Sequence, residues 1–340
     1  MSGCKWSSLH RRKFILTAAL FTAGAIVPSR AQAYPSKSVR FIVSSAAGSG
    51  TDILARILGD KLSQRWGQSV IVENRDGVGG VTGTDFVVRS PPDGYTLCMG
   101  FTGPLAASPA LLKSVPYNPV KDLATVTLVD SSPAVLVVHP SVPATSVKEL
   151  IALAKAEPGT LNFGSAGYGT IGHMSGELFR IMSGAHIVHV PYKSVAQAVT
   201  DVVGGQIKVL FHVAPAVMPL VQAGKLRALG VTSPKRWSIV PDLPAIAEAG
   251  LPGYESTVWH GVVVPAATPR PIINKLYQDI ADVMKIEEVR QKFAAQWIEP
   301  LGTTPDSFAA FLKSEVENNA KLVKEAGTAG AVNRNCRAIP

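Results

Sequence analysis

The chain has 340 residues, a length typical of about two domains, and its 46% apolar and 17% charged residues predict a packed core. Its three cysteines form no C-x-x-C pair, which excludes a disulfide framework, a zinc finger and an iron–sulfur cluster. The net charge of +9 is concentrated at the start, because five of the 33 Lys and Arg residues precede position 34 and leave 28 basic against 24 acidic residues. The remaining basic residues are scattered, so no nucleic-acid partner is expected.

The first 33 residues have the organisation of an export signal. A basic cluster, Arg11-Arg12-Lys13, precedes the apolar run Phe14–Val27, and the triplet Ala31-Gln32-Ala33 predicts cleavage before Tyr34. The run is shorter than the ~18–20 residues that span a bilayer, which disfavours an uncleaved anchor. The arginine pair also suits the twin-arginine signal, so both the Sec and the twin-arginine routes stay open. We therefore expect a soluble mature protein in a bacterial periplasm.

The mature chain opens with a strand, a loop of small residues and a helix. Val39–Val43 predicts the strand, Ser44–Gly50 the loop, and apolar residues at helical spacing from Ile53 to Trp66 the helix. Further strands are predicted at Ser69–Glu73, Tyr95–Met99, Ala134–Val138, Thr160–Phe163, His186–Val190, Ile207–Phe211, Arg227–Val231 and Trp259–Val264. Further helices are predicted at Val147–Ala156, Ile171–Met182, Pro271–Met284 and Pro305–Ala326.

Strands that alternate with helices predict an α/β fold with mixed, mostly parallel sheets flanked by helices. Two Gly-rich turns between a strand and a helix, around Gly48 and Gly164, predict two such lobes with a ligand cleft between them. The chain is expected to enter the second lobe through Val126–Pro133 and to return near Tyr254–Trp259. The predicted organisation is a signal peptide over 1–33, a discontinuous first lobe over 34–132 and 259–327, a second lobe over 133–258 and a tail over 328–340.

The two Gly-rich loops are candidate anion sites. A helix N-terminus presents unpaired N–H groups and about half a positive charge, and small residues let a ligand approach the backbone. Thr51 and Thr170 occupy the positions expected for helix N-caps. Tight packing of strand on helix would explain one such loop alone, whereas two at equivalent places favour anion binding.

Other chemistries fit these loops less well. Gly167–Gly172 matches the G-x-G-x-x-G dinucleotide pattern but lacks the acid about 20 residues later, and the first loop lacks a P-loop lysine. Ser165 and His173 could pair as a nucleophile and base, but no G-x-S-x-G motif surrounds the serine. The seven histidines have no H-x-x-x-H spacing, so no metal and no cofactor are predicted. Cys98, in a predicted strand, and Cys336 could pair, although nothing in the sequence supports that bond.

A series of short motifs resembles the extracytoplasmic receptors of tripartite tricarboxylate transporters, the Bug family. The motifs run through the mature chain from about Tyr34 to Gly327. They are Tyr34-Pro35, Val72–Arg75, Gly79-Gly80, Pro92–Leu97, Pro116–Pro119, Asp122-Leu123, Leu161–Gly167, His189–Lys193, Gly204–Gln206, Leu226–Thr232, Pro241–Pro244 and Pro252–Glu255.

The resemblance implies a periplasmic-binding-protein clamshell that holds a ligand carboxylate between the two loops and passes it to a membrane permease without catalysis. It also implies small carboxylates as ligands: di- and tricarboxylates, hydroxy acids, acidic amino acids or aromatic acids. Carried over to this chain, the ligand-binding residues are Ala46, Ala47, Gly48, Ser49, Gly50, Thr51, Asp52, Thr102, Gly164, Ser165, Ala166, Gly167, Tyr168, Gly169, Thr170, His173 and His212. A monomer is expected.

The chain departs from the family pattern at places that concern the ligand. Ser44-Ser45 stand where the family has Pro and an aromatic residue, and His212 stands where it often has an acid. Loss of an acid removes a partner for a ligand ammonium, so the departures predict a carboxylate without an amino group. An exported hydrolase or isomerase acting in the same cleft, or a ligand sensor for a membrane signalling protein, are the alternatives.

Overall fold

A computed structural model describes residues 34–192 and 194–327. The predicted signal peptide, the tail after Gly327, Lys193, Cys4 and Cys336 lie outside this part of the chain. The strands are β1 (Val39–Val43), β2 (Val70–Asn74), β3 (Thr96–Phe101), β4 (Leu123–Val138), β5 (Asn162–Ser165), β6 (Val188–Pro191), β7 (Val209–Val213), β8 (Arg227–Val231) and β9 (Thr257–Pro265). The helices are α2 (Gly50–Trp66), α3 (Val81–Val88), α4 (Ser108–Leu111), α5 (Val147–Ala156), α6 (Ile171–Ser183), α7 (Val195–Val203), α8 (Ala214–Gln222), α9 (Arg270–Met284), α10 (Glu287–Ala294) and α11 (Pro305–Ala326), with short helical turns η1 (Val78–Gly80) and η2 (Gly103–Ala107).

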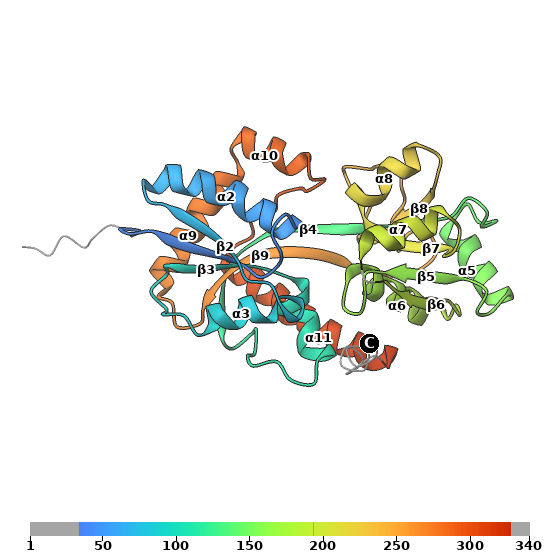
Figure 1. Cartoon of the computed structure of the whole chain (residues 1–340), viewed down its shortest axis with the longest axis horizontal. Helices are drawn as coiled ribbons and strands as arrows, with labels where there is room; N and C mark the ends of the chain where they lie inside the picture. Colours follow the sequence, from blue (N-terminus) through green and yellow to red (C-terminus); the bar gives the residue numbers. More distant parts are fainter. Residues whose placement is uncertain (1–33, 193, 328–340) are drawn as a thin grey trace, which may run out of the picture. The chain divides into compact units, whose positions relative to one another are not determined.

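The strands form a mixed sheet in the order β2-β1-β3-β9-β4-β7-β5-β6, with β8 paired to β4. β1 lies parallel to β2 and β3, and β5 lies parallel to β6 and β7. The long strands β4 and β9 pair antiparallel with each other and with their other neighbours, and Figure 1 shows both running between the two groups of shorter strands. The α/β class and the mixed sheet agree with the sequence prediction.

Strand β4 is longer than the sequence predicted. We expected a strand over Ala134–Val138 preceded by a crossing segment, but the strand begins at Leu123 and its first half pairs with β9. The polar residues in its middle are satisfied inside the sheet. Asp130 is fully buried, receives a 2.9 Å hydrogen bond from Ser132 Oγ and lies 2.7 Å from His260 Nδ1. Because these polar groups pair with one another, the strand continues through a segment whose composition is typical of a loop.

Helices cover both faces of the second group of strands. Phe163, Val209 and Phe211 pack against Phe179 of α6, whereas Leu210, Val135 and Val137 pack against residues of α7 and α8. This alternation along each strand is the period of two expected of a sheet covered on both faces. In the first group, α2 buries Leu54, Leu58 and Leu62 completely, and each such leucine contributes about 1.5–3 kcal/mol.

Several helices were not predicted. α3, α8 and α10 are short, eight or nine residues each, and lack the long apolar period that identified the other helices. Gly184 follows α6 in the left-handed conformation that commonly ends a helix. Within residues 34–192 and 194–327, no helix has the length and hydropathy needed to span a membrane.

Candidate functional site

Parallel pairing brings the predicted site loops to the carboxyl ends of their strands. β1, β2 and β3 end at Val43, Asn74 and Phe101, so the loop that begins at Ser44 lies at the same sheet edge as Thr102. β5 and β7 likewise end at Ser165 and Val213 at one edge. Ligands of open α/β sheets bind beyond such edges.

The loop before α2 is closed by its own side chains. Ser49 is the N-cap of α2, two residues before the expected Thr51, and its Oγ accepts from the Asp52 N–H at 3.3 Å. The Gly48 N–H donates to the Asp52 carboxylate at 2.8 Å, and the Ser45 and Ser49 hydroxyls lie 2.7 Å apart. Thr51 is buried inside the first turn instead.

Asp52 carries a negative charge at this helix start. Burial raises the pKa of its carboxyl, but hydrogen bonds from Arg56, Gly48 and Asn74 outweigh burial and hold the pKa below its usual value. The Arg56 Nε and the Asn74 Nδ2 donate to the carboxylate at 3.0 and 2.9 Å. The carboxylate is therefore ionised at neutral pH and occupied by donors of the chain itself.

The loop before α6 is organised differently. Thr170 is the N-cap, as predicted, but its side chain makes no capping bond, and its hydroxyl donates to the Gly167 carbonyl at 2.7 Å. The Ser165 hydroxyl is fully buried, accepts from the Gly167 N–H at 3.1 Å and lies 2.7 Å from His189 Nε2. The first turn of α6 contains no acid. Its leading N–H groups consequently face no side-chain acceptor at the N-cap.

His173 lies in this first turn and is 1% exposed. The Gly169 N–H donates to its Nδ1 at 3.2 Å, while its Nε2 is buried without a hydrogen-bond partner. Burial, with a smaller contribution from His189, lowers the pKa of His173 to about 3, and burial lowers that of His189 to about 4. The two imidazole rings, 4.7 Å apart, are therefore both neutral at physiological pH.

The third helical residue makes the same hydrogen bond at both helix starts but carries a charge only at α2. Asp52 and His173 are each the third helical residue, and each accepts a hydrogen bond from the glycine that precedes the N-cap, Gly48 or Gly169. Both glycines have φ near +80°. The Asp52 carboxylate thus places a negative charge at the start of α2. The neutral His173 imidazole accepts the equivalent hydrogen bond at the start of α6 but adds no charge there.

His212 lies on the other face of the sheet from His173. Successive side chains of β7 point to opposite faces of the sheet. Phe211 packs under α6, whereas Leu210 packs under α7 and α8, and His212 shares the face of Leu210. His212 is half-buried, its Nδ1 has no partner, and burial lowers its pKa against an opposing backbone hydrogen bond at Val213. Thr102 is also half-buried, and its hydroxyl accepts from the Trp259 N–H at 2.9 Å.

The remaining predicted residues differ in exposure. Ala46, Ala47, Gly48 and Gly50 are exposed, Gly164 is buried, and Ala166 to Gly169 are half-buried. The predicted residues of each loop lie close to one another, but no hydrogen bond connects the two loops among the described residues. The role of both loops in ligand binding stays a prediction.

Two residues that organise the loops were missed from the sequence. Asn74 donates to the Ser45 carbonyl at 3.1 Å and to Asp52, and it accepts from Arg56 at 3.0 Å. His189 pairs with Ser165, whereas the sequence had suggested His173 for that serine. Asn74 directly follows a predicted strand, and a polar residue at a strand end could have indicated a site residue.

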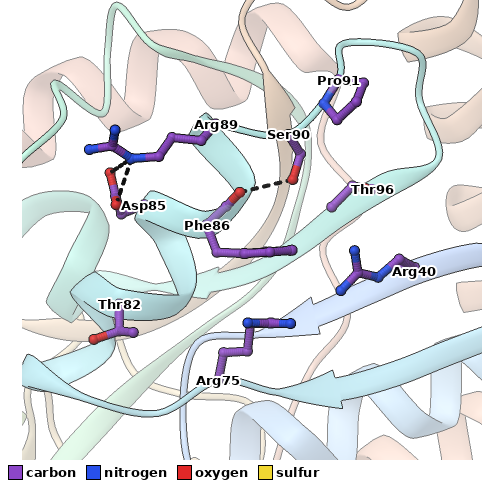
Figure 2. Close-up of a pocket in the computed structure, with 9 residues that line it drawn as sticks. All are labelled: Arg40, Arg75, Thr82, Asp85, Phe86, Arg89, Ser90, Pro91 and Thr96. Carbon is purple, nitrogen blue, oxygen red and sulfur yellow. Dashed lines mark hydrogen bonds and ion pairs between the residues drawn. The ribbon is translucent and has the colours of Figure 1, made fainter.

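A cavity of about 410 Å³ is lined by none of the predicted site residues (Figure 2). The guanidinium groups of Arg75 and Arg40 lie 3.8 and 4.8 Å from the centre of the Phe86 ring. Arg40 makes two hydrogen bonds to Glu73, at 2.7 and 2.8 Å. This arrangement braces the end of β2 next to Asn74. Within residues 34–192 and 194–327, no group of three or more His, Cys, Asp or Glu side chains is placed to hold a metal ion.

The fold is the two-lobed α/β architecture of periplasmic solute-binding proteins. Two structures from Rhodopseudomonas palustris resemble it: Rpa4515 with adipate (35% identity, TM-score 0.75, 86% of this chain and 98% of that chain) and MatC with bound malate (28%, 0.71, 85% and 100%). The protein BugT of Bordetella pertussis is 38% identical over 307 residues, which cover 90% of this chain and 94% of BugT. The chain belongs to the tripartite tricarboxylate transporter family of receptors, whose model matches residues 54–328.

Proposed function

We propose that the chain is an extracytoplasmic receptor that captures a small carboxylate and delivers it to the membrane permease of a tripartite transporter. In this proposal the loops Ala46–Asp52 and Gly164–Thr170 face the ligand from two lobes, with the lobe limits stated above. Export through the predicted signal, with cleavage before Tyr34, places the receptor in the periplasm.

The observation that carries the proposal is the start of α6. A helix start attracts anions because its first N–H groups have no partner within the helix. At α2 the Asp52 carboxylate already lies there, but α6 has no acid in its first turn and no capping bond from Thr170. The ligand carboxylate is therefore assigned to α6, and the loop before α2 supplies a neighbouring wall.

The ligand class follows from the relatives and from the loops. Adipate and malate, bound by the two Rhodopseudomonas proteins, are dicarboxylates. In this chain the only acid of the predicted site, Asp52, already accepts hydrogen bonds from Arg56, Asn74 and Gly48. A ligand ammonium would find no free carboxylate there, which supports an acid without an amino group.

The test is calorimetric titration of the purified protein with adipate, malate, glutamate and aspartate, followed by recovery of each compound. We expect an amine-free acid to bind more tightly than either amino acid, to raise the thermal midpoint, and to be recovered unchanged. Binding by none of the acids, or tighter binding of glutamate or aspartate, contradicts the proposal.

One observation favours an exported hydrolase as the second candidate. Ser165 Oγ lies 2.7 Å from His189 Nε2, a distance suited to a nucleophile and its base. However, Ser165 is fully buried and its hydroxyl is engaged with Gly167, so a substrate has no access to it in this conformation. Chemical conversion of a bound acid in the same titration would establish this alternative.

A further inference from the structure

The cavity of Figure 2 is lined by three arginines and an aromatic ring. Arg40 belongs to β1, Arg75 follows β2 and Arg89 follows α3, so separate elements bring their guanidinium groups to one place, around Phe86. Arginine stays protonated in proteins, so the cavity holds three positive charges. Its volume of about 410 Å³ lies in the range of small-molecule sites.

The carboxylates beside the cavity balance only two of these three charges. Both oxygens of Glu73 accept hydrogen bonds from Arg40, at 2.7 and 2.8 Å. Both oxygens of Asp85 accept from Arg89, at 3.0 and 2.8 Å. The next acid along the chain, Asp76, accepts from the backbone N–H of the residue that follows it, at 2.7 Å. One positive charge of the cavity is therefore left without a bonded carboxylate.

Arg75 is the arginine that lacks a bonded carboxylate. Its Nη2 lies 3.6 Å from Glu73 Oε2, which is longer than a hydrogen bond, and its Nε has no partner. Its guanidinium lies 3.8 Å from the centre of the Phe86 ring. Contact with a ring uses the face of a guanidinium and leaves the N–H groups in its plane for an anion. The side chain is 39% exposed, so an anion in the cavity can reach these groups.

We propose that this cavity is a second anion site, formed by none of the predicted loop residues, that binds a small carboxylate with one negative charge and a planar apolar body. The single unbalanced charge matches a monoanion, and the guanidinium of Arg75 offers the paired N–H groups that a carboxylate accepts. Phe86 and Pro91 add apolar surface to the same cavity, against which an aromatic ring can pack. A dicarboxylate such as malate would bring a second negative charge that these side chains do not balance.

The probe is benzoate, titrated into the wild-type protein by ligand-detected NMR, first alone and then with malate present. We expect a dissociation constant in roughly the millimolar range, because water screens partly exposed arginines, and we expect malate not to displace benzoate. Benzyl alcohol has a similar ring and no charge, so it should bind roughly tenfold more weakly, as for one lost bond to a charged group. Absence of benzoate binding, its displacement by malate, or equal binding of the alcohol overturns the inference.

Substitutions on both sides of the charge balance locate the site. Asp85→Asn removes an acid, so benzoate affinity should rise about two- to fivefold. Arg75→Gln removes the unbalanced cation, and affinity should fall roughly tenfold, whereas Arg75→Lys keeps the charge without the planar donors and should recover only part of the loss. Arg236→Gln is the matched control, because it removes an arginine from an exposed ion pair, 2.7 Å from Glu248, outside the cavity.

The outcomes separate this inference from the proposed function. Unchanged benzoate affinity in Arg75→Gln, or an equal loss in Arg236→Gln, overturns the inference. If Arg75→Gln does not fold, Asp85→Asn decides: tighter benzoate binding supports the site, and equal or weaker binding overturns it. Malate affinity in Asp85→Asn should equal that of the wild type, and a parallel change in both affinities overturns the inference. Failure of the wild type to bind malate or the other acids contradicts the proposed function alone, since the benzoate titration does not depend on it.

Discussion

Replacing Asn74 with Ala should loosen the loop before α2. The Asn74 amide donates to the Ser45 carbonyl and to the buried Asp52 carboxylate, at 3.1 and 2.9 Å, and thereby ties the end of β2 to the end of β1 and to the helix start. Its side-chain oxygen also accepts from Arg56. Alanine removes all these bonds and adds no new acceptor or donor.

The expected magnitude comes from the two donated bonds. The bond to the Ser45 carbonyl is neutral and contributes about 0.5–1.5 kcal/mol, whereas the bond to the ionised Asp52 contributes about 1.5–3 kcal/mol. The bond from Arg56 is exposed to solvent and adds little. The free energy of unfolding should therefore fall by about 2–4 kcal/mol, which lowers the thermal midpoint by roughly 4–8 °C in a chain of this size.

The assay is thermal unfolding of the wild type and of Asn74→Ala between pH 3 and pH 7. The folded-state pKa of Asp52 is depressed, so its contribution is present above the unfolded pKa of about 4 and is lost as the pH falls through the folded value. The deficit of the variant should therefore be largest near pH 7 and shrink in acid. Asn74→Asp places a second carboxylate beside Asp52 and should be worse at pH 7 than Asn74→Ala. A deficit below 0.5 kcal/mol, or one that grows in acid, refutes the reasoning.

Three further predictions concern other parts of the chain. N-terminal sequencing of periplasmic protein should begin at or near Tyr34, and an intact Met1 form in membranes would contradict the predicted cleavage. Asp279 is 1% exposed, and hydrogen bonds from a lysine, a tryptophan and an arginine lower its pKa although burial raises it. In urea unfolding, Asp279→Asn should lower the free energy of unfolding by about 3–5 kcal/mol at pH 7 and by less at pH 3. Gly48→Ala should lose about 1–2 kcal/mol through its φ of +79° alone, since an added Cβ meets no atom within 4 Å, whereas Gly50→Ala, with equally open space, should not destabilise.

Elements with strong local signals were predicted well from the sequence. α5 and α11 begin and end where predicted, because Ser146 and Thr304 cap their starts and amphipathic spacing runs through both helices. β4 was underestimated because its polar middle is satisfied by His260, a residue 130 positions away. Local sequence does not reveal such a distant partner, so the sequence predicted only a segment crossing into the second lobe there.

The loops themselves were predictable, but their internal bonding was not. A run of small residues between a strand and a helix predicts a helix start open to a ligand. Which residue caps that start depends on backbone angles, and Ser49 rather than Thr51 has them. The roles of Asn74 and His189 depend on strand register, because β2 must lie beside β1, and β6 beside β5, before either side chain reaches its loop. Strand register depends on packing between segments that are far apart in the sequence, so the contacts of Asn74 and His189 could not be predicted from the sequence alone.

The two helix starts differ in whether the chain itself supplies an anion to the first N–H groups. An acid at the third helical position fills the space in front of the first N–H groups with a charge that belongs to the chain, and Arg56 then balances that charge. A buried histidine at the same position closes the loop with one nitrogen, and its other nitrogen has no hydrogen-bond partner. Because both side chains accept the bond from the preceding glycine, we expect an exchange of these residue types to change the charge at the helix start more than the loop geometry. In the proposed receptor, the start of α6 is therefore the one left free for a ligand anion, and the Asp52 carboxylate keeps the start of α2 closed to one.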